Sequence, residues 1–258
     1  MYKYKTIAFS NQKGGVGKTT SAINISACLA MKGNRVLLVD SDPQGNATSG
    51  LGINKRKTSS SVYDLLIGRA KGTEVINKTA LQNLDCIPSS MDLVGAEIEL
   101  VDSERREYKL KDALLPLYEL YDFIIIDSPP SLGLVTLNAL AASDAVVVPL
   151  LCEFYSLEGL SQLTRTIKNV KNNINPHLEL LGVLINMYDG RLTLTSQVLE
   201  EIKKYFPDKI FKRPIPRNVK ISEAPGYGQP ICVYDKYSKG ALAYDSLTDE
   251  FIDRCKGF

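Results

Sequence analysis

The segment that most restricts the fold is Asn11–Thr20, which reads NQKGGVGKTT and follows the short apolar run Thr6–Phe9. After it, Thr20–Lys32 has the apolar spacing of a helix and stops at Gly33. A glycine-rich turn between a buried strand and a helix presents successive backbone N–H groups, and the helix N-terminus, to an anion. Glycines let the main chain wrap closely around phosphate groups. The segment therefore predicts a strand, a phosphate-binding loop and a helix.

The side chains at the end of this loop suit a nucleotide bound with magnesium. Lys18 is placed to neutralise β- and γ-phosphate oxygens, and the Thr19 hydroxyl is a ligand for Mg²⁺. The usual pattern, G-x-x-x-x-G-K-[ST], has a glycine where this chain has Gln12, and a second lysine, Lys13, stands beside it. A chance glycine-rich turn is the competing interpretation, and the position between strand and helix argues against it.

Short apolar runs rich in β-branched residues alternate with helical stretches along the chain. The predicted strands are Thr6–Phe9, Val36–Val39, Leu84–Ile87, Phe123–Ile126, Ala145–Val148 and Val183–Ile185. The predicted helices are Thr20–Lys32, Gly133–Ala142, Ser156–Val170, Leu194–Phe206 and Gly240–Cys255, the last docking its apolar stripe onto the core. Nearly continuous Val, Ile and Leu is typical of strands buried on both faces of a parallel sheet. We therefore expect an α/β fold with a doubly wound, mostly parallel sheet, formed by residues 1–258 as a single domain.

Composition excludes several classes of protein. The net charge is only +2, so any nucleic-acid surface is a local patch. The five cysteines lack metal-like spacing and there is one histidine, which argues against disulfide frameworks and zinc or iron–sulfur sites. We see neither a signal peptide nor the run of about 18 apolar residues that a membrane-spanning helix needs. We expect a cytoplasmic protein with no membrane partner.

Two further segments place carboxylates at the ends of predicted strands. Leu37–Asn46 reads LLVDSDPQGN and carries Asp40 and Asp42, whereas Tyr121–Pro130 reads YDFIIIDSPP and carries Asp127. The carboxyl ends of the strands are the ligand-binding edge of an α/β sheet. Carboxylates there hold Mg²⁺ through water or orient an attacking water. An Asp-Pro turn is a simpler interpretation for the first pair taken alone.

The second lysine is explained by a resemblance. K-G-G-x-G-K-[ST], at residues 13–19, is similar to the deviant Walker A motif of P-loop NTPases of the ParA/MinD family. The resemblance implies an ATPase whose two subunits enclose two ATP molecules face to face, with Lys13 reaching the partner's nucleotide as an arginine finger does. The ATP contacts that it implies in the loop are Lys13, Gly14, Gly15, Val16, Gly17, Lys18, Thr19 and Thr20.

The two carboxylate segments resemble switch I and switch II of the same family. This likeness implies that Asp42 positions the hydrolytic water and makes Lys13, Lys18 and Asp42 the catalytic residues. The implied Mg²⁺ shell consists of Thr19, Asp40 and Asp127. ATP and Mg²⁺ are thus the expected cofactors.

Two downstream segments extend the resemblance to nearly the whole chain, from Lys5 to Ala243. Gly182–Asp189 and Ile215–Pro225 resemble the family segments that bracket adenine, so Asn186 and the backbone of Pro216, Arg217 and Asn218 are expected to contact the base. The pattern I-P-R-N-x-x-x-S-E-A-P is similar to ParA/Soj partition ATPases and differs from MinD.

The resemblance to partition ATPases also implies partners. An ATP-dependent homodimer would bind double-stranded DNA without sequence preference, and a ParB-type centromere-binding protein would stimulate hydrolysis and release it from the nucleoid. The implied DNA contacts are Arg191 and Lys220, and Arg213 is a further candidate because it is one of the basic residues in the same part of the chain. A solvated surface is the simpler interpretation for all three. Because the loop begins at residue 11, we expect no sequence-specific DNA module before it.

Two sister functions remain as alternatives. A MinD-like membrane-associated regulator would end in a basic amphipathic helix, whereas Asp249–Phe258 mixes both signs of charge. An electron-transfer relative would need a cluster cysteine after the Asp127 strand, and Ser128–Gly133 contains none. The MinD-like function is the stronger of the two alternatives.

Overall fold

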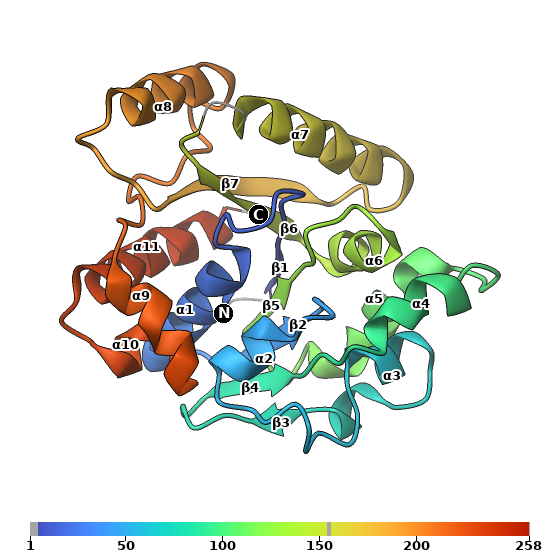
Figure 1. Cartoon of the computed structure of the whole chain (residues 1–258). Coiled ribbons are helices and arrows are strands. Elements are labelled where there is room, and N and C mark those ends of the chain that lie inside the picture. Colours follow the sequence, from blue (N-terminus) through green and yellow to red (C-terminus); the bar gives the residue numbers. More distant parts are fainter. Residues whose placement is uncertain (1–4, 154–155, 258) are drawn as a thin grey trace.

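The computed structural model describes residues 5–153 and 156–257, which include one seven-stranded sheet with the strand order β3-β4-β2-β5-β1-β6-β7 (Figure 1). β3 pairs antiparallel with β4, and the other neighbouring strands pair in parallel. The bounds are β1 Lys5–Phe9, β2 Val36–Asp40, β3 Asn77–Lys78, β4 Leu84–Ile87, β5 Phe123–Asp127, β6 Ala145–Leu151 and β7 Glu179–Asn186. The doubly wound, mostly parallel sheet is confirmed.

Helices cover both faces of the sheet and enclose two separate hydrophobic cores (Figure 1). One core lies under α1 (Lys18–Met31), α10 (Ile231–Tyr234) and α11 (Lys239–Cys255). The other lies under α3 (Val62–Leu66), α4 (Leu93–Glu99), α5 (Lys109–Leu114), α6 (Leu134–Ala142), α7 (Ser156–Asn173) and α8 (Thr193–Tyr205). Successive strand residues point to opposite faces, so Ile125 belongs to the first core while Ile124 and Ile126 belong to the second.

The remaining helices are short and connect these layers. They are α2 (Asn46–Gly50), α9 (Val219–Glu223) and the 3₁₀ turns η1 (Gly72–Glu74), η2 (Arg106–Tyr108), η3 (Leu115–Leu117) and η4 (Ala224–Tyr227). No helix within the described part of the chain combines the length and apolar character needed to cross a membrane.

Every predicted strand and long helix is present, with ends that differ by a few residues. The predicted docking of α11 is confirmed, because its stripe of Tyr244, Leu247, Phe251 and Cys255 is buried. β3 was not predicted, since its two residues are polar and carry no alternating pattern. The short helices α2 to α5 were also missed, because helices of five to seven residues are too short to show a periodicity.

The sheet brings the loops that carry the motifs to one edge. In the strand register, Asp127 lies opposite Phe9 of β1 on one side and opposite Asp40 of β2 on the other. The loops that follow β1, β2 and β5 therefore meet. On the far side of the sheet, the segment 209–217 runs beside β7 as an irregular extra strand, with parallel bridges from Val183 to Ile210 and from Tyr188 to Pro216.

Candidate nucleotide-binding site

The loop between β1 and α1 has the backbone geometry of an anion cradle. Gly15 and Gly17 have φ angles of +74° and +85°, a left-handed conformation that favours glycine. A Cβ atom on Gly17 would also lie 2.5 Å from Nδ2 of Asn186. At Gly14, by contrast, no described atom lies within 4 Å of an added Cβ. The fold itself therefore requires glycine at position 17, whereas it does not require glycine at position 14.

Lys18 is held inside this loop. Its side chain is buried, and Nζ donates a hydrogen bond to the Lys13 carbonyl oxygen at 3.1 Å. Burial lowers the pKa of the Lys18 ammonium, and the carboxylates of Asp127 and Asp42 partly offset that effect. The ammonium thus lies between the loop backbone and the carboxylates, where a phosphate group would receive its charge.

Asp127 is a buried carboxylate without a hydrogen-bond partner. It is fully buried, and neither oxygen makes a hydrogen bond to the described residues; the Thr19 hydroxyl lies beside it without hydrogen-bonding geometry. Burial, together with the charge of Asp40, raises its pKa well above the usual range. A buried carboxylate is costly unless it meets a cation. Two free carboxylate oxygens beside a threonine hydroxyl form the hard-oxygen donor set that Mg²⁺ prefers, so these residues fit the ion.

Asp40 differs from Asp127 because its oxygens are already used. One oxygen accepts hydrogen bonds from the backbone N–H and the hydroxyl of Thr48, both at 2.7 Å, and the other accepts from the Asp42 N–H at 3.2 Å. Burial raises the pKa of Asp40 to about 6. Asp42 in turn accepts from the Gln44 N–H at 2.9 Å. Asp40 therefore shapes the turn that carries Asp42, and its role in the Mg²⁺ shell stays a prediction.

The residues predicted to contact the base line one groove of about 540 Å³ next to the loop. Its lining includes Gly17, Thr20, Asn186, Pro216, Arg217 and Asn218. Val219 and Ser222, from the same predicted segment 215–225, also line it, as does Tyr244, which sequence reasoning missed. The sequence did not predict that Tyr244 lines this groove, because Tyr244 lies on α11, in the C-terminal region and far along the chain from the loop. The structure therefore brings the predicted base-side residues together beside the phosphate-binding loop.

Asn186 has contacts that its predicted role did not include. Its amide Nδ2 donates to the Val16 carbonyl at 2.8 Å and to the Ser21 hydroxyl at 3.1 Å, and that hydroxyl lies 3.2 Å from the Tyr244 hydroxyl. These bonds tie β7 and α11 to the start of α1. Asn186 thus stabilises the loop through these hydrogen bonds, and a contact with adenine stays a prediction.

Lys13 lies on the outer side of the same loop. Its side chain is 41% exposed and forms an ion pair with Glu153, which follows β6. The Lys13 ammonium is therefore partly exposed and paired with Glu153, in contrast to the buried Lys18. Its action on the nucleotide of a second subunit stays a prediction.

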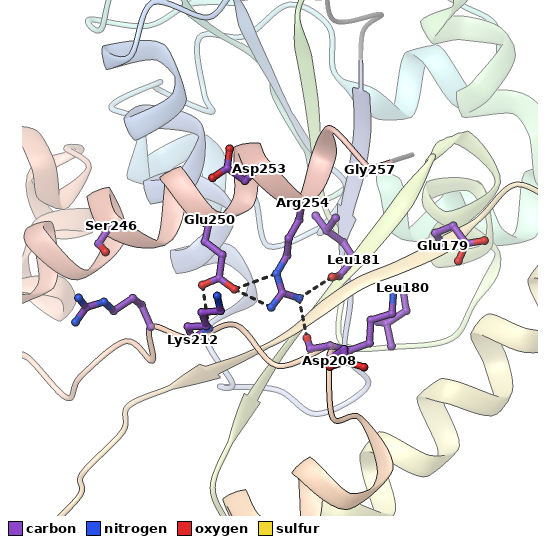
Figure 2. Close-up of a pocket in the computed structure, with 12 residues that line it drawn as sticks. Glu179, Leu180, Leu181, Asp208, Lys212, Ser246, Glu250, Asp253, Arg254 and Gly257 are labelled. Carbon is purple, nitrogen blue, oxygen red and sulfur yellow. Dashed lines mark hydrogen bonds and ion pairs between the residues drawn. The ribbon is translucent and has the colours of Figure 1, made fainter.

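The three predicted DNA contacts are exposed. Arg191 pairs with Asp189 at 2.6 Å, and Lys220 pairs with Glu223 at 2.9 Å. Arg213 instead lines a second, larger groove of about 880 Å³ between α11, the start of β7 and the segment 208–213 (Figure 2). This larger groove lacks the phosphate-binding loop. The DNA contacts stay predictions.

Comparison with known proteins establishes the family. A family model described as "AAA domain" matches residues 4–180. The Bacillus subtilis sporulation initiation inhibitor protein Soj is 56% identical over 246 residues, which cover 95% of this chain and 97% of the relative. The Myxococcus xanthus chromosome partitioning protein ParA is 52% identical over 250 residues, covering 97% of this chain and 88% of the relative. The chain belongs to the ParA/Soj family of ATPases.

A solved structure of similar fold extends the comparison. A Mycobacterium smegmatis protein named cobyrinic acid a,c-diamide synthase, crystallised with an ATP analogue and magnesium, superimposes with a TM-score of 0.86 at 39% identity. The match covers 98% of this chain and 96% of that chain. The ParA/Soj fold found here is therefore also the fold of a protein seen with both cofactors.

Proposed function

We propose that this chain is a partition ATPase that hydrolyses ATP with Mg²⁺ and uses the cycle to move or position DNA. The observation that carries the proposal is a pair of buried, opposite charges at the phosphate-binding loop: Lys18 curled over the loop and Asp127 with two free oxygens. Such groups are costly in an empty site and are retained where a ligand compensates them. We also propose that residues 1–258 form one ATPase domain, which the single sheet supports.

The protein groups divide the chemistry between them. The loop N–H groups and Lys18 bind the phosphates and stabilise the charge that develops on them. Asp42, at the carboxyl edge of β2, orients the attacking water. Thr19 and Asp127 would hold Mg²⁺, with Asp40 nearby, and the ion would supply charge neutralisation between the β- and γ-phosphates. The groove beside Asn186 would take the base.

ATP would close two subunits face to face. The outward position of Lys13 and the open surface at Gly14 support this arrangement, since both lie on the exposed side of the loop. Lys13 of each subunit would leave Glu153 and act on the nucleotide of the other subunit. Hydrolysis would then require the dimer, and loss of the γ-phosphate would separate the subunits.

The closed dimer would bind double-stranded DNA through phosphate contacts, without sequence preference. The exposed positions of Arg191, Lys220 and Arg213 support this role. A ParB-type partner would stimulate hydrolysis and release the dimer. We propose that the ATP-bound form lies on the nucleoid in the cytoplasm, which the similarity to proteins named Soj and chromosome partitioning protein ParA supports.

A sedimentation experiment tests this proposal against the MinD-like alternative. The protein is incubated with ATP or ADP and spun with either a long duplex or liposomes containing anionic lipid. We expect ATP-dependent sedimentation with DNA of any sequence and none with liposomes. Sedimentation with liposomes alone would favour the membrane regulator. The apolar stripe of α11 is buried against the core, which supports the DNA-binding function over the membrane one.

A further inference from the structure

Arg254, near the end of α11, makes an unusual set of contacts with the main chain (Figure 2). Its guanidinium donates to the carbonyl oxygens of Leu181 at 3.0 Å, Lys209 at 3.1 Å and Ile210 at 2.6 Å. It also pairs with Glu250 one turn earlier, at 2.7 Å. The Arg254 side chain is only 18% exposed. One side chain therefore joins α11, β7 and the irregular strand at residues 209–217.

Two neighbouring features support a dedicated site for this guanidinium. The guanidinium carbon lies 4.2 Å from the centre of the Phe211 ring, and Glu250 accepts a hydrogen bond from the Lys212 N–H at 2.9 Å. Gly182 of β7 leaves the space: a Cβ there would lie 2.7 Å from Arg254 Nη1, from the Lys209 carbonyl and from the Phe211 ring. A glycine inside a strand often marks such a close approach.

The segment that Arg254 contacts, residues 209–211, leads directly to the base side of the nucleotide groove. After Phe211 the chain continues beside β7, where the Ile215 N–H donates to the Ile185 carbonyl at 2.8 Å and the Tyr188 N–H donates to the Ile215 carbonyl at 2.9 Å. The next residues, Pro216 to Asn218, line the groove. Their position thus depends on a strand that is irregular and pairs with β7 on one side.

The same helix is anchored to the phosphate side. Lys32, at the end of α1, pairs with Asp245 and Asp249 of α11 at 2.8 Å each, and Tyr244 contacts Ser21 near the start of α1. α11 therefore touches both halves of the site: α1, which carries the phosphate-binding loop, and through Arg254 the segment that carries the base-side residues.

We infer that Arg254, seated against Gly182, is a positioning residue that sets the base side of the nucleotide groove relative to the phosphate-binding loop. The inference rests on the proposed function. It assigns Arg254 to recognition of the nucleoside and not to the phosphates, which Lys18 and the loop bind without its help. Loss of the Arg254 contacts should therefore weaken binding of the nucleoside part of ATP more than binding of its phosphates.

The experiment compares ATP with inorganic triphosphate, which lacks the nucleoside, both with Mg²⁺. In Arg254→Met and in Gly182→Ala, we expect the Kd and KM for ATP to rise about tenfold, the scale of one or two lost hydrogen bonds, while the Kd for triphosphate changes less than about twofold. The kcat at saturating ATP should stay within about twofold. Lys256→Met, which removes a surface ion pair just after α11, is the matched control and should leave every value unchanged.

Further variants separate positioning from folding. Combining Gly182→Ala with Arg254→Met should add less than the sum of the two single changes, because the two residues are in contact. Gly182→Ala should keep part of its own effect, since a Cβ there also meets the Lys209 carbonyl and the Phe211 ring. Arg254→Lys keeps the charge beside Glu250 but loses the planar guanidinium, so its ATP affinity should lie between those of the wild type and Arg254→Met. If thermal unfolding shows that Arg254→Met is unfolded, Arg254→Lys takes its place in the experiment. Equal losses for ATP and triphosphate, or unchanged ATP affinity, would overturn the inference. If the wild-type chain binds triphosphate as tightly as ATP, the base-side part of the proposed function fails first.

Discussion

The charges at the phosphate-binding loop and those on the outer surface differ in their exposure to water, and therefore in how strongly they interact. Lys18 and Asp127 are buried, and their pKa values shift because water is excluded. Arg191 and Lys220 are exposed, and each already pairs with an acidic neighbour in its own chain. Exposed pairs contribute little and are screened by salt, whereas buried charges demand a partner. The positions and pKa values of the buried charges are therefore fixed by the fold before a ligand binds. The exposed charges, in contrast, can attract a ligand only through their combined effect.

The largest effect is expected at the buried lysine. Lys18→Ala removes the charge that faces the phosphates, so ATP affinity should fall by about 100-fold or more. Binding of a labelled ATP analogue measures this loss. Lys13→Ala, a change of the same type on the outer side of the loop, is the control and should retain most of the binding. Unchanged affinity in Lys18→Ala would contradict the assignment of the loop.

Next in size is the loss of hydrolysis in Asp42→Ala. The attacking water loses its orienting carboxylate, so kcat should fall by about 100-fold or more while ATP binding persists. The product should be a dimer that stays on DNA with ATP. Size-exclusion chromatography checks it: a monomer in the presence of ATP would mean that Asp42 serves the structure of the turn, which its bond to the Gln44 N–H would then explain.

Gly14→Val tests whether the open surface of the loop is an interface. An added Cβ atom has no described atom of its own chain within 4 Å, so folding and nucleotide binding should survive. A branched side chain where two backbones meet face to face should block the dimer. Light scattering with ATP is expected to report a monomer, and a normal dimer would place the interface elsewhere. Gly17→Val, which would strike Asn186, should instead lower stability.

Asp127→Asn should separate stability from function. Since the folded pKa of Asp127 is raised above the unfolded value, its charge opposes folding, and this loss of stability grows as pH rises from the unfolded pKa through the folded one. At neutral pH and without ligand, the variant should therefore be more stable by about 1–3 kcal/mol. Adding Mg²⁺ and ATP should stabilise the wild type more than the variant, which keeps Lys18 and the loop but loses a carboxylate for the ion. Thermal unfolding with and without chelator measures both effects.

A control of opposite sign is available for that experiment. The Arg35 ion pair lowers the pKa of Asp122, so its charge favours folding above the unfolded pKa and this contribution is lost as pH falls through the folded one. Asp122→Asn should therefore lower the unfolding temperature slightly at neutral pH. If Asp127→Asn lowers it as well, the buried carboxylate is satisfied in the free protein.

The smallest change per residue is expected on the outer surface. Replacing Arg191 and Lys220 together by alanine removes four cations from a dimer, so the log–log salt slope of DNA binding should flatten by up to about 3.6, from about 0.9 for each contact. Affinity should fall equally on two unrelated duplexes, because phosphate contacts carry no base information. Lys78 and Arg105, which also pair with acidic neighbours, are matched controls when changed together to alanine. An unchanged slope would move the DNA surface elsewhere.

The sequence alone determined the fold class and the phosphate side of the site. Both depend on local patterns: β-branched runs buried on two faces, a glycine loop between strand and helix, and aspartates at strand ends. Parallel strands align their carboxyl ends at one edge, so the nearness of Lys18, Asp42 and Asp127 follows once the strands are recognised. The Asn186 and Pro216–Asn218 segments were found by resemblance, which no local pattern would have supplied.

Only the tertiary structure decided which polar groups are satisfied and which are free. Asp40 and Asp127 look alike in the sequence, yet Thr48 donates to an oxygen of Asp40, whereas neither oxygen of Asp127 accepts a hydrogen bond from the residues that the structure describes. Tyr244 and Arg254 reach the site and its supports from α11, far along the chain. Hydrogen bonding and burial are set by contacts between distant segments, whose geometry depends on how helices pack on the sheet, and a linear pattern carries no record of that packing.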